Sequence, residues 1–214
     1  MKFVQLTLAA LPLIAGSALA AQSVDLSIKG LVSPTSCTPV LSGSGVIDYG
    51  KISQQDLKFD QGTRLPVRHL ALTIACNGQS RFALRMRDNR DGSANVNSEI
   101  YYGLGRDPSG NKIGLYSVSF DPTQTTADLL PQIYGTESTT AGVAWRSASV
   151  QPIDIGARSY LGFTDIAGST AGPIALQNLS STITVETVIS AKQNLDLSRE
   201  IYIDGSATLE VVYL

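Results

Sequence analysis

The chain has 214 residues, a formal net charge of −2 at pH 7 and only 16% charged residues. A mildly acidic chain without a basic stripe lacks the electrostatic signature of nucleic-acid-binding proteins, so we expect no nucleic-acid partner. The length suffices for a substantial core, and we expect one domain over residues 21–214, larger than the about 100 residues of a compact sandwich.

Residues 1–20 have the pattern of a secretory signal peptide. Lys2 supplies the positive start, residues 3–14 are mostly apolar, and Ala18 and Ala20 form a small-x-small cleavage site. The apolar core is too short to span a bilayer, and no later stretch approaches about 18 consecutive apolar residues. We therefore expect export to the periplasm, the cell surface or the medium, and no integral membrane segment.

The N-terminal half of the mature chain alternates apolar and polar residues, as strands do. Val24, Leu26 and Ile28 alternate up to Gly30, and Pro34 interrupts the pattern. Further strands are predicted at 46–52, 65–76 and 82–86, and the polar cluster 88–92 predicts a turn.

Cys37 and Cys76 are the only cysteines, about 40 residues apart. In an exported protein two cysteines predict a disulfide, and two unpaired buried thiols are the alternative. Cys76 shares one face of its strand with Leu70, Leu72 and Ile74, so its side chain should point toward the core.

Residues 88–173 are richer in Gly, Ser, Thr, Asp and Pro, with short apolar runs at 113–120, 142–145 and 160–163. This composition predicts an enlarged, loop-rich middle region, with weak helical character only around 125–130. Strict alternation returns at 182–189, and the run 201–203 leads into the last strand.

The last ten residues predict a strand that continues to the end of the chain. Ala207, Leu209, Val211 and Tyr213 share one face of it, and Gly205 supplies a turn or bulge at its start. Because chain ends fray unless a sheet holds them, this strand should be part of the main sheet.

Four features that could indicate chemistry are better explained as structure. His69 is the only histidine and should face solvent, so we expect neither an enzyme nor a zinc site. The 88–92 cluster lacks the ligand spacing of a calcium loop, and the glycines at 103–105 lack nucleotide-binding spacing. No cofactor is expected. A sugar site remains an alternative to core packing for the aromatic residues Tyr101, Tyr102, Trp145 and Tyr160.

The signal peptide, the cysteine spacing and the alternating last strand with Tyr213 next to last resemble the pilin subunits of bacterial chaperone–usher fimbriae. Segments 46–52, 88–90 and 204–214 are also similar to an uncharacterised family of secreted fimbrial-type bacterial proteins. The resemblance implies an all-β, immunoglobulin-like sandwich that lacks one strand.

In such subunits a periplasmic chaperone strand, and then the N-terminal extension of the next subunit, fills the open groove at an outer-membrane usher. The resemblance implies that Ala207, Leu209, Val211 and Tyr213 line this groove. If 24–32 is the first strand of the sandwich, only three mature residues precede it, too few for a donor strand. Alternatively the donor stripe is Val24, Leu26, Ile28 and Gly30.

In pilins a glycine often lies about fourteen residues before the C-terminus. Ile201 holds that place here, and Gly205 is the nearest glycine. The sequence leaves two functions open, a structural or minor fimbrial subunit and a self-contained secreted or periplasmic binding protein of adhesin type. Because the pilin-like features lie at both ends, the middle region is better explained as an insertion within one domain than as a separate binding domain.

Overall fold

The computed structural model describes residues 24, 26–30 and 35–214, and the expected signal peptide lies outside them. The chain separates into two units, Met1–Ser33 and Pro34–Leu214. In the first unit the described residues belong to no strand, so the strand expected at 24–30 is wrong for them. They have no partner strand to accept their backbone hydrogen bonds, and Val24, Leu26 and Ile28 are 95%, 86% and 88% exposed.

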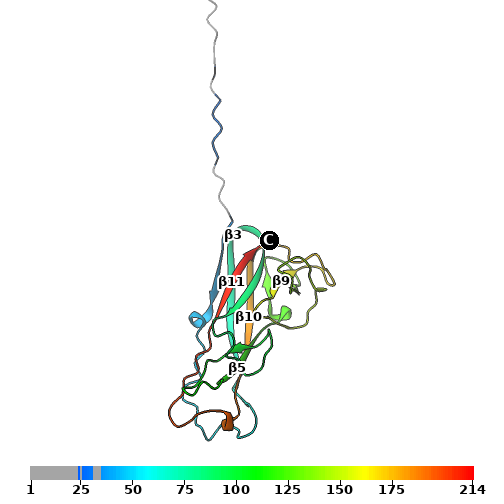
Figure 1. Ribbon diagram of the computed structural model, residues 1–214. Coiled ribbons are helices and arrows are strands. Elements are labelled where there is room, and N and C mark those ends of the chain that lie inside the picture. The colour runs from blue at the N-terminus through cyan, green and yellow to red at the C-terminus, as the bar shows by residue number, and fades with distance from the viewer. Residues whose placement is uncertain (1–23, 25, 31–34) are drawn as a thin grey trace, which may run out of the picture. The chain divides into compact units, whose positions relative to one another are not determined.

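The second unit consists almost entirely of strands (Figure 1). No α-helix occurs in the described part of the chain. The strands are β1 Cys37–Leu41, β2 Thr63–Arg64, β3 Arg68–Asp88, β4 Tyr102–Gly103, β5 Gly114–Phe120, β6 Thr126–Ala127, β7 Tyr134–Ser138, β8 Ile153–Asp154, β9 Tyr160–Thr164, β10 Ala175–Ile189 and β11 Ala207–Tyr213. Three 3₁₀ turns accompany them, η1 Ser42–Gly45, η2 Pro122–Gln124 and η3 Lys192–Asn194.

The long strand β3 organises the sheet. Its first part lies between β1 and β10, and its second part lies between β11 and β9, with every pairing antiparallel. Ala75 pairs with Asn178 and Ser80 with Leu176, so β3 has several extra residues at one point of the ladder. Such a bulge bends a strand. Figure 1 shows β3 curving over near the C-terminus of the chain.

Because β3 bends, the two halves of the curled sheet share one core. Leu72 and Ile74 from the first half and Leu84 and Met86 from the second belong to the same buried cluster. The predicted all-β, immunoglobulin-like sandwich is confirmed, and the enlarged middle region supplies β4 to β9.

The predicted disulfide is also confirmed. Cys37 at the start of β1 and Cys76 on β3 are bonded, with an S–S distance of 2.05 Å. Cys76 is 7% exposed and faces the core with Leu72 and Ile74, as its strand pattern predicts.

Several predicted element boundaries need correction. The expected strands 65–76 and 82–86 belong to one strand, β3, which begins only at Arg68, and β10 begins at Ala175, earlier than expected. Segments 46–52 and 201–203 form no strand, although Ile47 and Ile201 pack against the core. Their apolar side chains are therefore partly buried without a backbone ladder.

The helical character expected around 125–130 is wrong. This segment contains β6, and Asp128 has a positive φ of 45°, which no helix accommodates. The Asp128 carboxylate instead accepts hydrogen bonds from the backbone N–H groups of Gln177 and Asn178 on β10. This contact fixes the non-helical conformation.

Candidate functional site

The strand β11 has a free backbone edge. Its neighbour on one side is β3, and the structure describes no strand on its other side. Asn89 N–H donates to the carbonyl of Ser206, and Leu214 N–H donates to that of Arg81. In an antiparallel ladder such bonds recur at every second residue, so the even-numbered residues bond to β3. The N–H and C=O groups of Ala207, Leu209, Val211 and Tyr213 therefore point away from β3.

The free edge of β1 offers far fewer hydrogen-bond donors. Asn77 N–H donates to the carbonyl of Ser36, and the same alternation directs Cys37, Pro39 and Leu41 outward. Cys37 N–H already donates to the Tyr213 hydroxyl at 2.6 Å, and Pro39 has no N–H. Of the two edges, β11 is thus the one that can pair along its whole length with another strand.

An apolar groove of about 280 Å³ opens between these two edges. One side is formed by the end of β1 and the following segment, and the other by residues 203–209. Buried core residues of β3, β5 and β10 close the bottom, so a strand lying in the groove would contact the core directly. The residues from the two sides that line it are Leu41, Gly45, Ile47, Tyr49, Ile203, Gly205, Ser206, Ala207 and Leu209.

The absence of a side chain at Gly205 leaves one end of the groove open. A Cβ atom at this position would lie 3.0 Å from Leu104 Cδ2 and 3.0 Å from Tyr116 Cε1. A side chain here would therefore press on the groove wall, which explains a glycine just before β11.

The residues that line the groove are uncharged. Tyr116 lines it and stacks on Tyr102 with ring centroids 5.2 Å apart, and burial raises the pKa of both hydroxyls, so both stay neutral. Glu210 alternates with the core-facing residues of β11 and pairs with Arg85. The hydrogen bond from Arg85 lowers the pKa of the Glu210 carboxyl. The ion pair thus lies on the outer face of the sheet.

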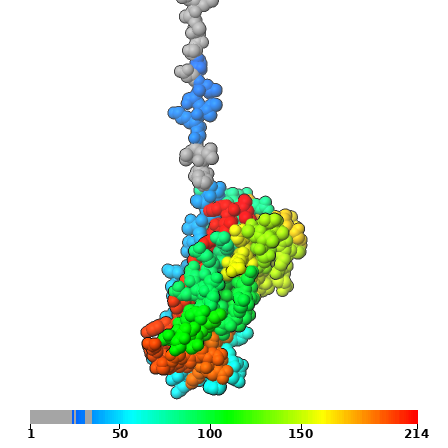
Figure 2. Space-filling model, in the orientation of Figure 1, coloured from blue at the N-terminus to red at the C-terminus, as the bar shows by residue number. Residues whose placement is uncertain are grey.

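The structure brings together most of the predicted groove residues. Ala207, Leu209 and Val211 pack against the core, and the first two line the groove. Tyr213 is 48% exposed, and its hydroxyl accepts a hydrogen bond from Cys37 N–H; Figure 2 shows the C-terminal end of the chain at the surface. The possible donor stripe lies in the first unit, where Val24, Leu26, Ile28 and Gly30 are exposed.

Sequence reasoning missed the opposite side of the groove. Tyr49 lies in the segment expected to be a strand, and its hydroxyl bonds to Thr187 Oγ1 at 3.0 Å. Leu104 and Gly45 also line the groove, and only their contacts across the fold reveal this. Pro39 was an available signal, because a proline within a strand marks an edge.

His69 and the 88–92 cluster, which were considered above for catalysis or metal binding, make ordinary structural contacts. His69 is exposed, with Nδ1 3.1 Å from Thr184 Oγ1. Asp88 accepts hydrogen bonds from Arg90 N–H and Gly103 N–H, and residues 89–92 form the predicted turn. Among the residues that the structure describes, no three His, Cys, Asp or Glu side chains form a group able to hold a metal ion.

The four aromatic residues do not form one sugar-stacking surface. Tyr102 is fully buried, and its hydroxyl donates to the carbonyl of Ile155. Tyr160 lies beneath the Arg85 guanidinium, whereas Trp145 Nε1 donates to the carbonyl of Gly142.

Within residues 24, 26–30 and 35–214, no helix has the length and apolar character needed to cross a bilayer. The structure thus offers no helical membrane span in its described part.

Comparison with known proteins finds relatives of similar size. Residues 26–101 match a family described as "Protein of unknown function (DUF1120)". The chain is 26% identical over 242 aligned positions to "Uncharacterized protein YhcF" of Escherichia coli (strain K12), covering all of both chains. It is 25% identical over 241 positions to "Protein GltF" of the same organism, covering 96% of this chain and 95% of that protein. The family match includes the disulfide, the end of β1 and the following segment, which form one side of the groove, and β3, which contributes to its bottom.

Proposed function

We propose that this protein is a subunit of a bacterial surface fimbria, completed by a strand from a partner. The observation that supports this function best is the apolar groove beside the free edge of β11. An unpaired edge next to an open apolar groove invites association, and a partner strand is one way to cover both. Addition of a partner strand would pair the free edge through backbone hydrogen bonds and fill the groove with side chains.

The dimensions of the edge define the partner strand. The outward backbone groups of β11 run from Ala207 to Tyr213, a span of about 20 Å at 3.3 Å per residue. A strand of seven residues covers this span. Its every second side chain should be apolar, because alternate side chains enter the groove.

The chain's own N-terminal segment has this pattern. Val24, Leu26, Ile28 and Gly30 recur at every second position over seven residues, and the three large side chains are exposed. We propose that this segment fills the groove of another subunit, and that a periplasmic chaperone strand fills the groove before assembly at an outer-membrane usher. In this role the protein acts without catalysis.

The test is a titration of a fluorescent peptide of residues 22–30 into the mature chain. The chain carries Leu26→Asp and Ile28→Asp, so its own segment cannot compete. We expect saturable binding, and no binding of a peptide with the same two substitutions.

A matched pair of acceptor variants locates the binding site. Val211→Asp places an unpaired carboxylate on the core-facing side of β11 and should weaken binding at least about 100-fold. Val212→Asp adds the same charge to the opposite face and should leave binding unchanged. If the chain purifies as a stable monomer that ignores the peptide, the sandwich is already complete, and a self-contained secreted binding protein replaces the subunit proposal.

A further inference from the structure

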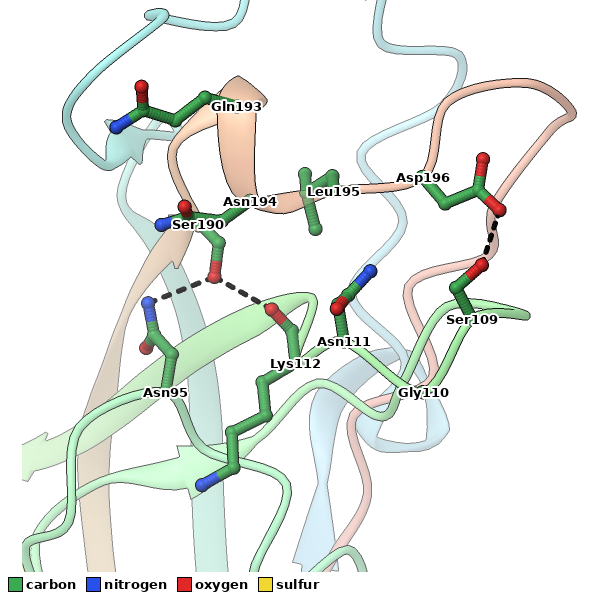
Figure 3. Close-up of a pocket in the computed structure, with 10 residues that line it drawn as sticks. All are labelled: Asn95, Ser109, Gly110, Asn111, Lys112, Ser190, Gln193, Asn194, Leu195 and Asp196. Atoms are coloured by element: carbon green, nitrogen blue, oxygen red, sulfur yellow. Dashed lines mark hydrogen bonds between the residues drawn. The ribbon is translucent and has the colours of Figure 1, made fainter.

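A second hollow, of about 730 Å³, lies among loops and shares no residue with the groove (Figure 3). One wall is the loop before β5, which contains Ser109, Asn111 and Lys112. The other wall is the segment that follows β10, and Asn95 contributes from a third loop. Its lining is almost entirely polar, in contrast to the groove.

A buried carboxylate holds the two walls together. Asp107 is 5% exposed and accepts hydrogen bonds from Ser109 N–H at 3.0 Å and Asn111 N–H at 2.8 Å in its own loop. It also accepts one from Asp196 N–H, at 2.7 Å, on the opposite wall. Ser109 Oγ donates to Asp196 Oδ2 at 2.6 Å across the same gap. The hollow is therefore preformed.

Its charged groups are already engaged within the protein. Lys112 Nζ donates to the carbonyl of Ala94 at 2.8 Å. The Asp196 carboxylate accepts from the hydroxyls of Ser109 and Ser198, which lower its pKa to about 2. Lys112 and Asp196, the two charged residues that line the hollow, have opposite signs, so its lining carries no net charge.

The groups that remain free are amides. The side chains of Gln193 and Asn194 are exposed and make no hydrogen bond to another described residue. Asn111 Nδ2 donates to Asp107 and Asn95 Nδ2 donates to Ser190 Oγ, which leaves both amide oxygens as acceptors. An amide pairs a donor with an acceptor at fixed spacing, as adjacent hydroxyls of a sugar do. Half-buried Leu195 adds a small apolar surface.

We propose that this hollow binds a neutral saccharide. The free amides supply donors and acceptors for ring hydroxyls, and Leu195 contacts the C–H face of the ring. Because the lining carries no net charge, it offers a phosphorylated or sialylated sugar no net electrostatic attraction, which favours a neutral sugar. This site is independent of strand addition, so it would serve the protein whether or not the groove accepts a partner strand.

The test uses the full mature chain labelled with ¹⁵N and follows the side-chain amide signals of Gln193 and Asn194 by NMR. The probes are glucose, galactose, mannose, N-acetylglucosamine and their disaccharides, up to about 50 mM, because so few contacts imply millimolar Kd values. N-acetylneuraminic acid and glucose 6-phosphate are the charged probes. We expect saturable shifts of both amides with at least one neutral sugar and none with the charged pair.

The double variant Gln193→Ala, Asn194→Ala should weaken that affinity at least about fivefold. Its effect is read from the backbone signals of Lys112 and Leu195. Gln79→Ala removes an exposed amide from β3 that does not line the hollow, and it should leave the affinity unchanged. The proposal is overturned if no neutral sugar gives saturable shifts, if only the charged probes bind, or if the double variant binds as tightly as the natural chain.

Discussion

Loss of the Cys37–Cys76 disulfide should lower the free energy of unfolding by several kcal/mol. The bond closes a loop with a sequence separation of 39 residues. In the chain-entropy model a loop of this size stabilises the native state by about 4 kcal/mol at 25 °C, within a usual range of about 2–5 kcal/mol. This is a large part of a typical total of about 5–15 kcal/mol.

The double variant Cys37→Ala, Cys76→Ala measures this contribution without leaving a lone thiol. With a urea slope of about 2–3 kcal/mol/M, a loss of about 4 kcal/mol moves the denaturation midpoint down by about 1.3–2 M. Reductant should lower the midpoint of the natural chain to nearly that of the variant and leave the variant unaffected. A midpoint shift below about 0.5 M would refute the reasoning, as would a variant that still responds to reductant.

Three further substitutions test other contacts by chemical denaturation. Tyr213→Phe removes the acceptor of Cys37 N–H and should cost about 0.5–1.5 kcal/mol; an unchanged midpoint would show that the contact contributes nothing. Hydrogen bonds from Asp196, Asn111 and Ser109 outweigh burial and lower the pKa of Asp107. Its stabilisation is therefore complete above the unfolded pKa of about 3.9 and is lost as the pH falls through the folded value, a loss that Asp107→Asn should not show. Gly103→Ala would place Cβ 2.0 Å from Ser93 Oγ and should cost about 1–3 kcal/mol, whereas Gly78→Ala, in open space, should be nearly neutral.

Strand patterns predicted the core better than they predicted the backbone ladders. The alternation of Leu72, Ile74 and Cys76 correctly placed these side chains in the core, because burial and period two reinforce each other. The same pattern at 46–52 was misleading. Ile47 and Tyr49 do turn inward, but the open groove leaves their backbone without a partner strand.

The bend of β3 could not be predicted from the sequence, for a related reason. Asn77 and Gly78 look like a turn between two strands, whereas the structure continues one strand through them by a bulge against β10. A bulge depends on the partner strand, which local sequence does not specify.

The polar hollow lay beyond sequence reasoning altogether. Asp107 and Asp196 are far apart in the chain, and neither belongs to a motif. Only the folded sheet brings their loops together.

Hydrogen exchange along β11 tests the strand-accepting edge most directly. Thr208 and Glu210 N–H bond to β3, whereas Leu209 and Val211 N–H point outward, so one strand supplies both the probes and their controls. In the chain with the disabled N-terminal segment, Leu209 and Val211 should exchange fast, and the peptide of residues 22–30 should slow them at least about tenfold while Thr208 and Glu210 stay slow throughout. Leu209 and Val211 amides that are already slow without the peptide, or that stay fast with it bound, would contradict the account.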